Sequence, residues 1–145
     1  MRYCIIFDID GTLSNPEHRL HLIKTEPKQW DEFYAAARMD LPIKPIVALA
    51  GIIGEKCPII CVTGRVESIR GDTREWLDEY SIDYRGLYMR ADGDTRDDFV
   101  VKAELFDQMK ADGWDPIIAF EDRTQVVEMW RSKGVICAQV AEGNF

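Results

Sequence analysis

The segment FDIDGTL, Phe7 to Leu13, places two aspartates after an apolar stretch, and these are the first candidates for catalysis or metal binding. In an extended chain, residues i and i+2 point to the same side, so the carboxylates of Asp8 and Asp10 are expected to face one small volume. Two like charges held together need a cation or a shared proton. Oxygen ligands favour Mg²⁺. A hairpin turn at Asp10–Gly11 is the alternative, but the residues that follow lack strand alternation.

Two further polar motifs follow other apolar stretches. In VTGR, Val62 to Arg65, Thr63 offers a hydroxyl, Gly64 permits close approach to a ligand, and Arg65 offers a planar fork of donors for phosphate. A strand-to-helix loop with a Thr cap would look the same. In FEDR, Glu121 and Asp122 add two carboxylates, and Asp122 alone would pass for a helix cap.

Lys102 is a cationic candidate within the segment RDDFVVKAELF, Arg96 to Phe106. A lone lysine on a helix usually faces solvent. It matters here only if its helix begins beside the aspartates, where it would supply positive charge to a phosphoryl group.

The elements that must position these motifs alternate between apolar strands and amphipathic helices, which predicts a parallel sheet with helices on both faces. Ligands of such sheets bind beyond the carboxyl ends of the strands, so the motifs are expected to share one crevice. The expected strands are Tyr3–Phe7, Pro58–Val62, Leu87–Met89, Ile117–Phe120 and Val135–Val140. The expected helices are Lys28–Arg38, Pro45–Gly54, Ser68–Glu79, Asp98–Lys110 and Gln125–Lys133, with Gly134 ending the last.

Length and composition limit the class of protein. The 145 residues, 46% of them hydrophobic, suit one domain spanning 1–145. A net charge of −8 argues against wrapping long duplex DNA, although a few local cations could still hold one terminal phosphate. No apolar run could span a bilayer and no signal peptide is recognisable, so we expect a cytoplasmic protein without membrane attachment.

Neither the cysteines nor the histidines predict a metal site. Cys4, Cys61 and Cys137 lie in apolar runs and no CxxC pair occurs, which indicates reduced core cysteines. His18 and His21 form a lone HxxH without a ligand set of Glu or Cys residues beside it, which is typical of a solvated loop or helix start.

In their order, FDIDGTL, VTGR, Lys102 and FEDR resemble the four motifs of the haloacid dehalogenase superfamily. This resemblance implies a three-layer, Rossmann-like α/β fold with a parallel five-stranded sheet in the order 5-4-1-2-3. The segments in which relatives insert a cap, Ser14–Pro45 and about 90–96, are short and predict a minimal cap. Such a site admits the end of a polymer.

A narrower resemblance links GDTRDDFVVK, EDRTQVVEMWR and QVAEGNF to the 3′-phosphatase domains of phage polynucleotide kinase/phosphatases. It implies that Asp8 is the nucleophile and forms an aspartyl-phosphate, while Asp10 acts as general acid and then general base. It also implies that Thr63 hydrogen-bonds the phosphoryl group and that Lys102 bridges nucleophile and phosphate.

The same resemblance implies the rest of the site. Mg²⁺ would be held by Asp122, the Asp8 carboxylate and the Asp10 carbonyl, with Glu121 standing where relatives usually have Asp. Three residues match additional functional positions: Asp98 would orient Lys102 or Arg65, while Arg19 and Arg65 would bind substrate with Thr63, Gly64 and Lys102. The expected substrate is a 3′-phosphorylated DNA or RNA end or nucleotide. The chain contains no GxxxxGK[ST] motif, so we expect no kinase activity from it.

Three alternatives stay open from the sequence. A nucleotidase acting on nucleoside monophosphates fits the same motifs. A signalling receiver domain also combines Asp, Mg²⁺, Thr and Lys, although its phosphoacceptor follows a middle strand. A non-catalytic module that binds nucleic-acid ends is the third. DNA or RNA preference, oligomeric state and any separate kinase or ligase are not predicted.

Overall fold

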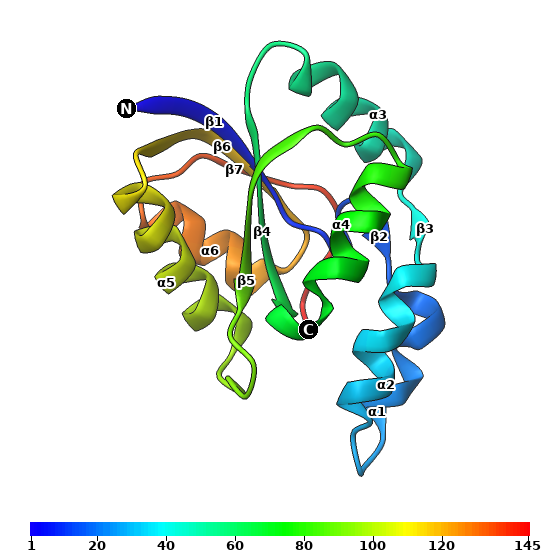
Figure 1. The fold of residues 1–145 in the computed structure, drawn as a ribbon. Coiled ribbons are helices and arrows are strands. Elements are labelled where there is room, and N and C mark those ends of the chain that lie inside the picture. The colour runs from blue at the N-terminus through cyan, green and yellow to red at the C-terminus, as the bar shows by residue number, and fades with distance from the viewer.

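A five-stranded parallel sheet forms the centre of the protein, and the computed structural model describes all of residues 1–145 (Figure 1). The strand order is β5-β4-β1-β6-β7, and every neighbouring pair is parallel. Counted among these five strands alone and read from the other edge, this is the expected order 5-4-1-2-3, which is confirmed. The strands are β1 Arg2–Phe7, β4 Ile59–Val66, β5 Tyr84–Arg90, β6 Trp114–Glu121 and β7 Cys137–Gln139.

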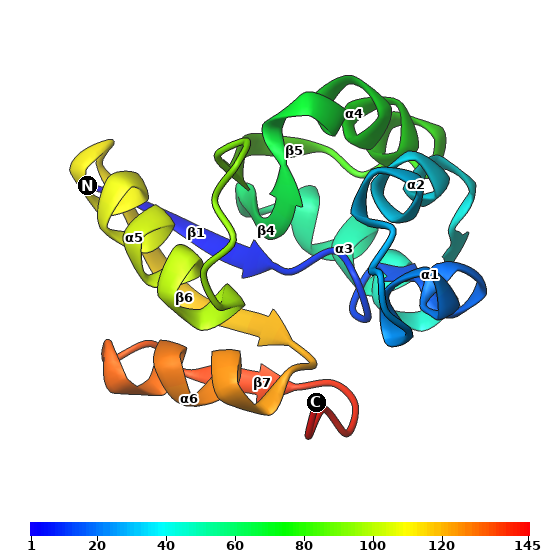
Figure 2. The same cartoon turned by 90° about the horizontal axis from the view of Figure 1, so that it is seen from below.

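The central strands are apolar because helices cover both faces of the sheet (Figures 1 and 2). Ile6 and Ile60 point into one core, which α5, Asp98–Ala111, and α6, Thr124–Ser132, cover. Their sequence neighbours, among them Phe7 and Cys61, point into a second core on the other face. Two helices close this second core, α3 at Lys44–Gly54 and α4 at Arg70–Glu79.

Some elements differ in length from the prediction. The helix expected at Lys28–Arg38 is α2, Trp30–Ala35, followed by a 3₁₀ turn at Ala36–Met39. Strand β4 continues to Val66, so VTGR forms the end of the strand and not the loop after it. Strand β7 begins only at Cys137, because the Val135 amide still donates to Trp130 and closes the end of α6.

One insert follows β1 and forms the small cap. It contains β2 Ser14–Asn15, a 3₁₀ turn at Glu17–Arg19, α1 His21–Lys24, α2, and β3 Leu41–Pro42. Strands β2 and β3 pair antiparallel in a separate two-stranded sheet, which the sequence pattern did not predict. The insert lies beyond the carboxyl ends of the main strands, beside α4 (Figure 1).

Other expectations from composition can be compared with the structure. The four cysteines are free and three are buried, Cys4, Cys61 and Cys137, which confirms core thiols. None of the helices combines the length and the apolar character needed to cross a membrane. His18 is partly exposed in the 3₁₀ turn of the insert, as expected, but it also contacts a buried carboxylate that is described below.

Candidate active site at the strand ends

Three buried carboxylates meet where β1 and β6 end. These strands are neighbours, so Asp8, which directly follows β1, lies beside Glu121 and Asp122 at the end of β6. The Asp8 amide donates to the Phe120 carbonyl at 3.0 Å, which fixes the position of Asp8 at the last rung of the ladder. One carboxylate oxygen from each of the three acids lies within 4.8 Å of the others. The parallel register thus gathers acids that are more than 110 residues apart in sequence.

Lys102 is buried among these acids. Its Nζ donates to Asp8 Oδ1 at 2.8 Å and to Glu121 Oε2 at 2.9 Å, and it lies 3.3 Å from Asp98 Oδ2. Helix α5 begins at Asp98, so Lys102 stands one turn into the helix and reaches the ends of β1 and β6. The condition that the sequence set for this lysine, a helix starting beside the aspartates, is therefore met.

The negative charge of this cluster exceeds its positive charge. Burial and then the neighbouring Glu121 charge raise the pKa of Asp8 well above its ordinary value. Burial and the Asp8 charge raise the pKa of Asp122 to about 7. Burial alone would lower the pKa of Lys102, but the charges of Asp8, Asp98 and Glu121 raise it instead. Carboxylates of this kind fit a divalent cation, which would offset the excess charge.

The two oxygens of Glu121 are already occupied. Oε2 accepts from Lys102, and Oε1 accepts the backbone amides of Asp122 at 3.2 Å and Arg123 at 3.3 Å. Glu121 therefore positions the lysine and the turn before α6. Asp122, whose carboxylate pairs with no lysine or arginine, is therefore better placed than Glu121 for a cation.

Asp10 does not join the acidic cluster through its carboxylate. Its Oδ1 accepts from Arg19 Nη2 at 2.7 Å, Arg65 Nη2 at 2.8 Å and Ser14 Oγ at 3.2 Å. Burial would raise the pKa of Asp10, but Arg65 and Arg19 hold it well below its usual range. The expectation that the Asp8 and Asp10 carboxylates face one cation is thus not met, and only the Asp10 backbone carbonyl stays a candidate metal ligand.

The reason for this difference is that the backbone bends at Ile9 and then turns at Gly11. The φ of Gly11 is +85°, which favours glycine, and a Cβ here would collide with the Asp122 carboxylate. The chain leaves extended geometry after β1, so the two-residue alternation no longer holds at Asp10. The turn leads into β2, which pairs with β3 and not with β1, so the hairpin alternative is not what this turn forms.

Asp40 is a buried carboxylate that sequence reasoning missed. Its Oδ1 accepts from Arg19 Nε at 2.8 Å and contacts His18 Nε2 at 2.7 Å. Its Oδ2 accepts from Arg19 Nη2 at 2.7 Å and Arg65 Nη2 at 3.3 Å. No motif surrounds Asp40 in the sequence. The only signal available was the need of two buried arginines for a counter-ion.

Arg19 and Arg65 therefore pair with aspartates in this structure, whereas the sequence suggested that they bind substrate. Both side chains are fully buried and bridge Asp10 to Asp40. Arg65 also donates to the Thr73 hydroxyl at 3.2 Å. Their donors orient the Asp10 carboxylate in this structure, and any role at a phosphate would act alongside that contact.

Thr63, Gly64 and Asp98 complete the predicted set. Thr63 is buried, and its hydroxyl accepts the Arg65 amide at 3.1 Å. A Cβ on Gly64 would collide with the Asp98 carboxylate. Glycine at this position therefore lets the start of α5 pack closely against β4, and it is not needed for the approach of a ligand. Asp98 contacts Lys102 and Arg90 but not Arg65.

A second hydroxyl lies in the cluster and was not singled out from the sequence. Thr12 donates from Oγ1 to Asp8 Oδ2 at 3.1 Å. With Lys102 on Oδ1, both Asp8 oxygens have fixed partners, which holds the carboxylate in one orientation.

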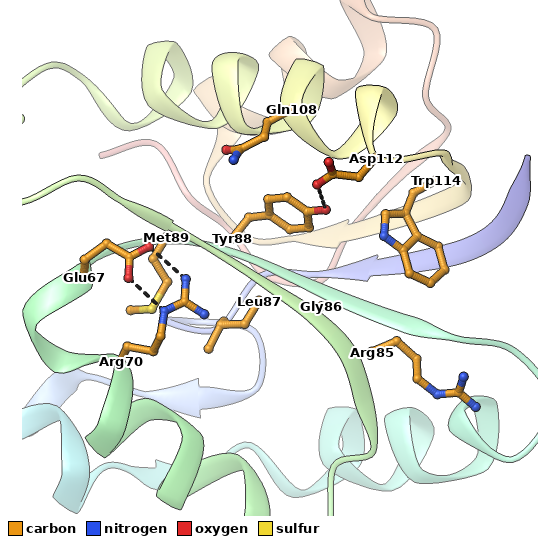
Figure 3. Close-up of a pocket in the computed structure, with 10 residues that line it drawn as sticks. All are labelled: Glu67, Arg70, Arg85, Gly86, Leu87, Tyr88, Met89, Gln108, Asp112 and Trp114. Carbon is orange, nitrogen blue, oxygen red and sulfur yellow. Dashed lines mark hydrogen bonds and ion pairs between the residues drawn. The ribbon is translucent and has the colours of Figure 1, made fainter.

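A separate cavity of about 280 Å³ lies beside the edge strand β5, between α5 and the start of α4 (Figure 3). Four of its polar side chains are paired with each other: Tyr88 donates to Asp112 at 2.6 Å, and Arg70 donates to Glu67. None of the predicted site residues lines it. The cavity and the acidic cluster are distinct features.

Comparison with known proteins identifies the family to which the chain belongs. The family model for the phosphatase domain of polynucleotide kinase PNKP matches residues 2–145. A protein of Autographa californica nuclear polyhedrosis virus, described as a "Putative bifunctional polynucleotide kinase/RNA ligase", is 30% identical over 128 residues, 88% of this chain and 17% of the viral protein.

Solved structures give the same result. A chain in the structure of the Pnkp1/Rnl/Hen1 RNA repair complex has a TM-score of 0.84 and 31% identity, and the match covers 100% of this chain and 44% of that one. A haloacid dehalogenase-like hydrolase from Streptococcus pneumoniae, at 14% identity and a TM-score of 0.66, shares the fold, with 96% of this chain and 84% of that one covered. The chain thus spans less than half the length of the two more similar relatives.

We predict that Asp40→Asn lowers the free energy of unfolding by about 3–5 kcal/mol, because removing one partner leaves buried arginine charge uncompensated. Urea denaturation of the variant and the wild type measures the change. Asp115→Asn is the matched control, because Asp115 forms only a half-exposed pair with Lys110 and should change stability by less than about 1 kcal/mol. Equal stability of Asp40→Asn and wild type would show that the Asp40 network contributes nothing.

Proposed function

Because the chain belongs to the family of phosphatase domains of polynucleotide kinase PNKP, we propose that this phosphatase removes the phosphate from 3′-phosphorylated nucleic-acid ends. The observation that carries the proposal is the pairing of Lys102 with Asp8 inside the acidic cluster, at 2.8 Å, while a second aspartate is held apart by arginines. A nucleophile and an acid–base group require such different environments.

The proposed reaction has two steps. An Asp8 carboxylate oxygen attacks phosphorus, the bond from phosphorus to the 3′ oxygen breaks, and the departing oxygen takes a proton from Asp10. Water then attacks the aspartyl-phosphate and gives a proton to Asp10. Inorganic phosphate leaves, and both carboxyl groups return to their starting state.

Asp10 must be protonated to act first as an acid. In the free protein Arg19 and Arg65 favour its charged form. A phosphate dianion close to Asp10 acts in the opposite direction, because a nearby negative charge raises the pKa of a carboxyl group. We therefore place the protonation of Asp10 in the substrate complex.

Positive charge at the phosphoryl group comes from two sources. Lys102 touches Asp8 already and needs no movement to meet a phosphoryl oxygen bound there. Asp8, Asp122 and the Asp10 carbonyl would hold Mg²⁺, which supplies charge neutralisation for the phosphoryl oxygens. Glu121 keeps Lys102 in place.

The size of the cap supports a polymer end as substrate. The insert between β1 and α3 holds only two short helices and a two-stranded sheet. The relatives are a viral protein described as a "Putative bifunctional polynucleotide kinase/RNA ligase" and a chain of the Pnkp1/Rnl/Hen1 RNA repair complex, and both names refer to nucleic acid. We assign the same substrate class to this chain.

We predict that the protein releases phosphate from a 3′-phosphorylated oligonucleotide in the presence of Mg²⁺, and much more slowly from a 5′-phosphorylated one or from mononucleotides. Asp8→Asn should lower the rate at least about 10³-fold, because the nucleophile is lost. The measurement is inorganic phosphate release from the 3′- and 5′-phosphorylated oligonucleotides and from 3′- and 5′-mononucleotides. Preference for 5′-mononucleotides would instead identify a nucleotidase.

A second prediction concerns Asp10. Asp10→Asn should slow release from a 3′-phosphorylated oligonucleotide about 10²–10⁴-fold, because the sugar oxygen leaves without a proton. The variant should slow the first step of p-nitrophenyl phosphate hydrolysis much less, because the leaving group of this ester needs no proton. Burst kinetics with this ester should then show the phosphorylated Asp8 accumulating. Equal losses on both esters without a burst would exclude the acid–base role.

A third prediction follows from the pKa of about 7 for Asp122. An unfolded Asp titrates near 3.9, so in the metal-free protein the stability from this raised pKa is present at low pH and lost as pH rises through about 7. Mg²⁺ binds the charged carboxylate. It should therefore raise Tm more at pH 8 than at pH 6, as thermal denaturation at fixed Mg²⁺ measures.

Asp122→Asn serves as the control for this experiment. It removes both the metal ligand and the titrating group, so the Mg²⁺-dependent rise in Tm and its pH dependence should both shrink. An equal rise in Tm at pH 6 and pH 8 in the unchanged protein would contradict the assignment of Asp122.

A further inference from the structure

The cap helix α2 presents an aromatic pair on its surface. Trp30 and Tyr34 stand one helical turn apart, with ring centroids 5.9 Å apart and planes inclined by 26°. Trp30 is 44% exposed, whereas the other three tryptophans are buried. The Trp30 ring also packs edge-on against the buried Phe33, with ring centroids 5.8 Å apart, so the helix holds part of the indole and the rest is open to solvent.

This pair is tied to the site by one side chain. The Arg19 guanidinium lies 4.3 Å from the ring centroid of Phe33, the residue next to Tyr34, and Nη1 donates to the Phe33 carbonyl at 3.3 Å. The same guanidinium donates from Nη2 to Asp10 at 2.7 Å. Helix α2 is thereby fixed directly beside the acid–base group.

Tyr34 is half-buried on this helix, one position after Phe33. Burial raises the pKa of its hydroxyl, and the charges of Arg90, Asp10, Asp98 and Arg19 act on it in turn. These four groups all belong to the networks at the strand ends. Figures 1 and 2 show α2 beyond the carboxyl ends of the strands, on the side away from α6.

One cation lies beside the pair. Lys28 Nζ lies 5.8 Å from the centroid of the Trp30 ring. Asp31 and Glu32 are also exposed on α2. Neither shares the face of Trp30, but Asp31 lies three residues before Tyr34 and on its side of the helix. An aromatic surface with a neighbouring cation is the arrangement that binds single-stranded nucleic acid by base stacking.

We infer that Trp30 and Tyr34 form a stacking surface for the nucleobase of the terminal nucleotide, whose 3′-phosphate occupies the acidic cluster. The inference rests on the proposed function and narrows it to unpaired ends, because a base must leave a duplex stack to meet these rings. Stacking against such a surface changes affinity about 5- to 150-fold per base.

The first test separates base recognition from chemistry. Trp30→Ala should lower kcat/KM for a single-stranded 3′-phosphorylated oligonucleotide about 5- to 150-fold, mainly through KM. Hydrolysis of glycerol phosphate, which has no base, should stay unchanged. Trp30→Phe should restore most of the loss. Tyr3→Ala, at an exposed aromatic on the opposite end of β1, is the matched control and should change neither substrate.

The second test reads binding without turnover. Acrylamide quenching of tryptophan fluorescence reports mainly Trp30, because the other indoles are buried. In an Asp8→Asn background, the single-stranded 3′-phosphorylated oligonucleotide should protect against quenching, and glycerol phosphate should not. Absence of protection by the oligonucleotide, or equal losses on both substrates in Trp30→Ala, would overturn the inference.

The two proposals fail in different ways. If the unchanged protein releases no phosphate from 3′-phosphorylated ends, the proposed function is lost. The quenching experiment is repeated in that case with whichever mononucleotide the protein hydrolyses. Protection of Trp30 from quenching would then support the stacking surface, and no protection would contradict it.

Discussion

Burial of more negative than positive charge at the ends of β1 and β6 is the constraint from which the rest of the site follows. Parallel pairing brings Asp8, Glu121 and Asp122 together out of water, which is costly without cations. Lys102 offsets part of the excess, and this requires α5 to begin beside the strand ends. Gly64 has to lack a side chain for the start of α5 to fit there.

A second charge network lies next to the first, and its positive and negative groups are equal in number. Two fully buried arginines, Arg19 and Arg65, pair with Asp10 and Asp40. The pKa of Asp8 is consequently raised while that of Asp10 is lowered, although the two aspartates are separated by one residue. The backbone bends at Ile9, between them, and the two carboxylates lie in different surroundings.

The sequence predicted the main sheet and much of the cluster because both depend on local patterns. Continuous apolar runs identify buried parallel strands, and polar residues directly after them must meet at one edge. Strands β2 and β3 are two residues each, too short for periodicity to show. Asp40 stands alone in the sequence, and its importance arises only from arginines at positions 19 and 65. The direction of the Asp10 carboxylate depends on the bend at Ile9 and on arginines at positions 19 and 65, which the alternation of residues does not specify.

The attachment of the insert has a consequence for movement. Its strands β2 and β3 pair with each other at the two ends of the insert, and two ion pairs, Arg19–Asp10 and Asp40–Arg65, tie the insert to the main body. Swinging the insert outward would separate both ion pairs, at a penalty of several kcal/mol. These contacts hold the insert as a fixed wall beside the strand ends rather than as a hinged lid.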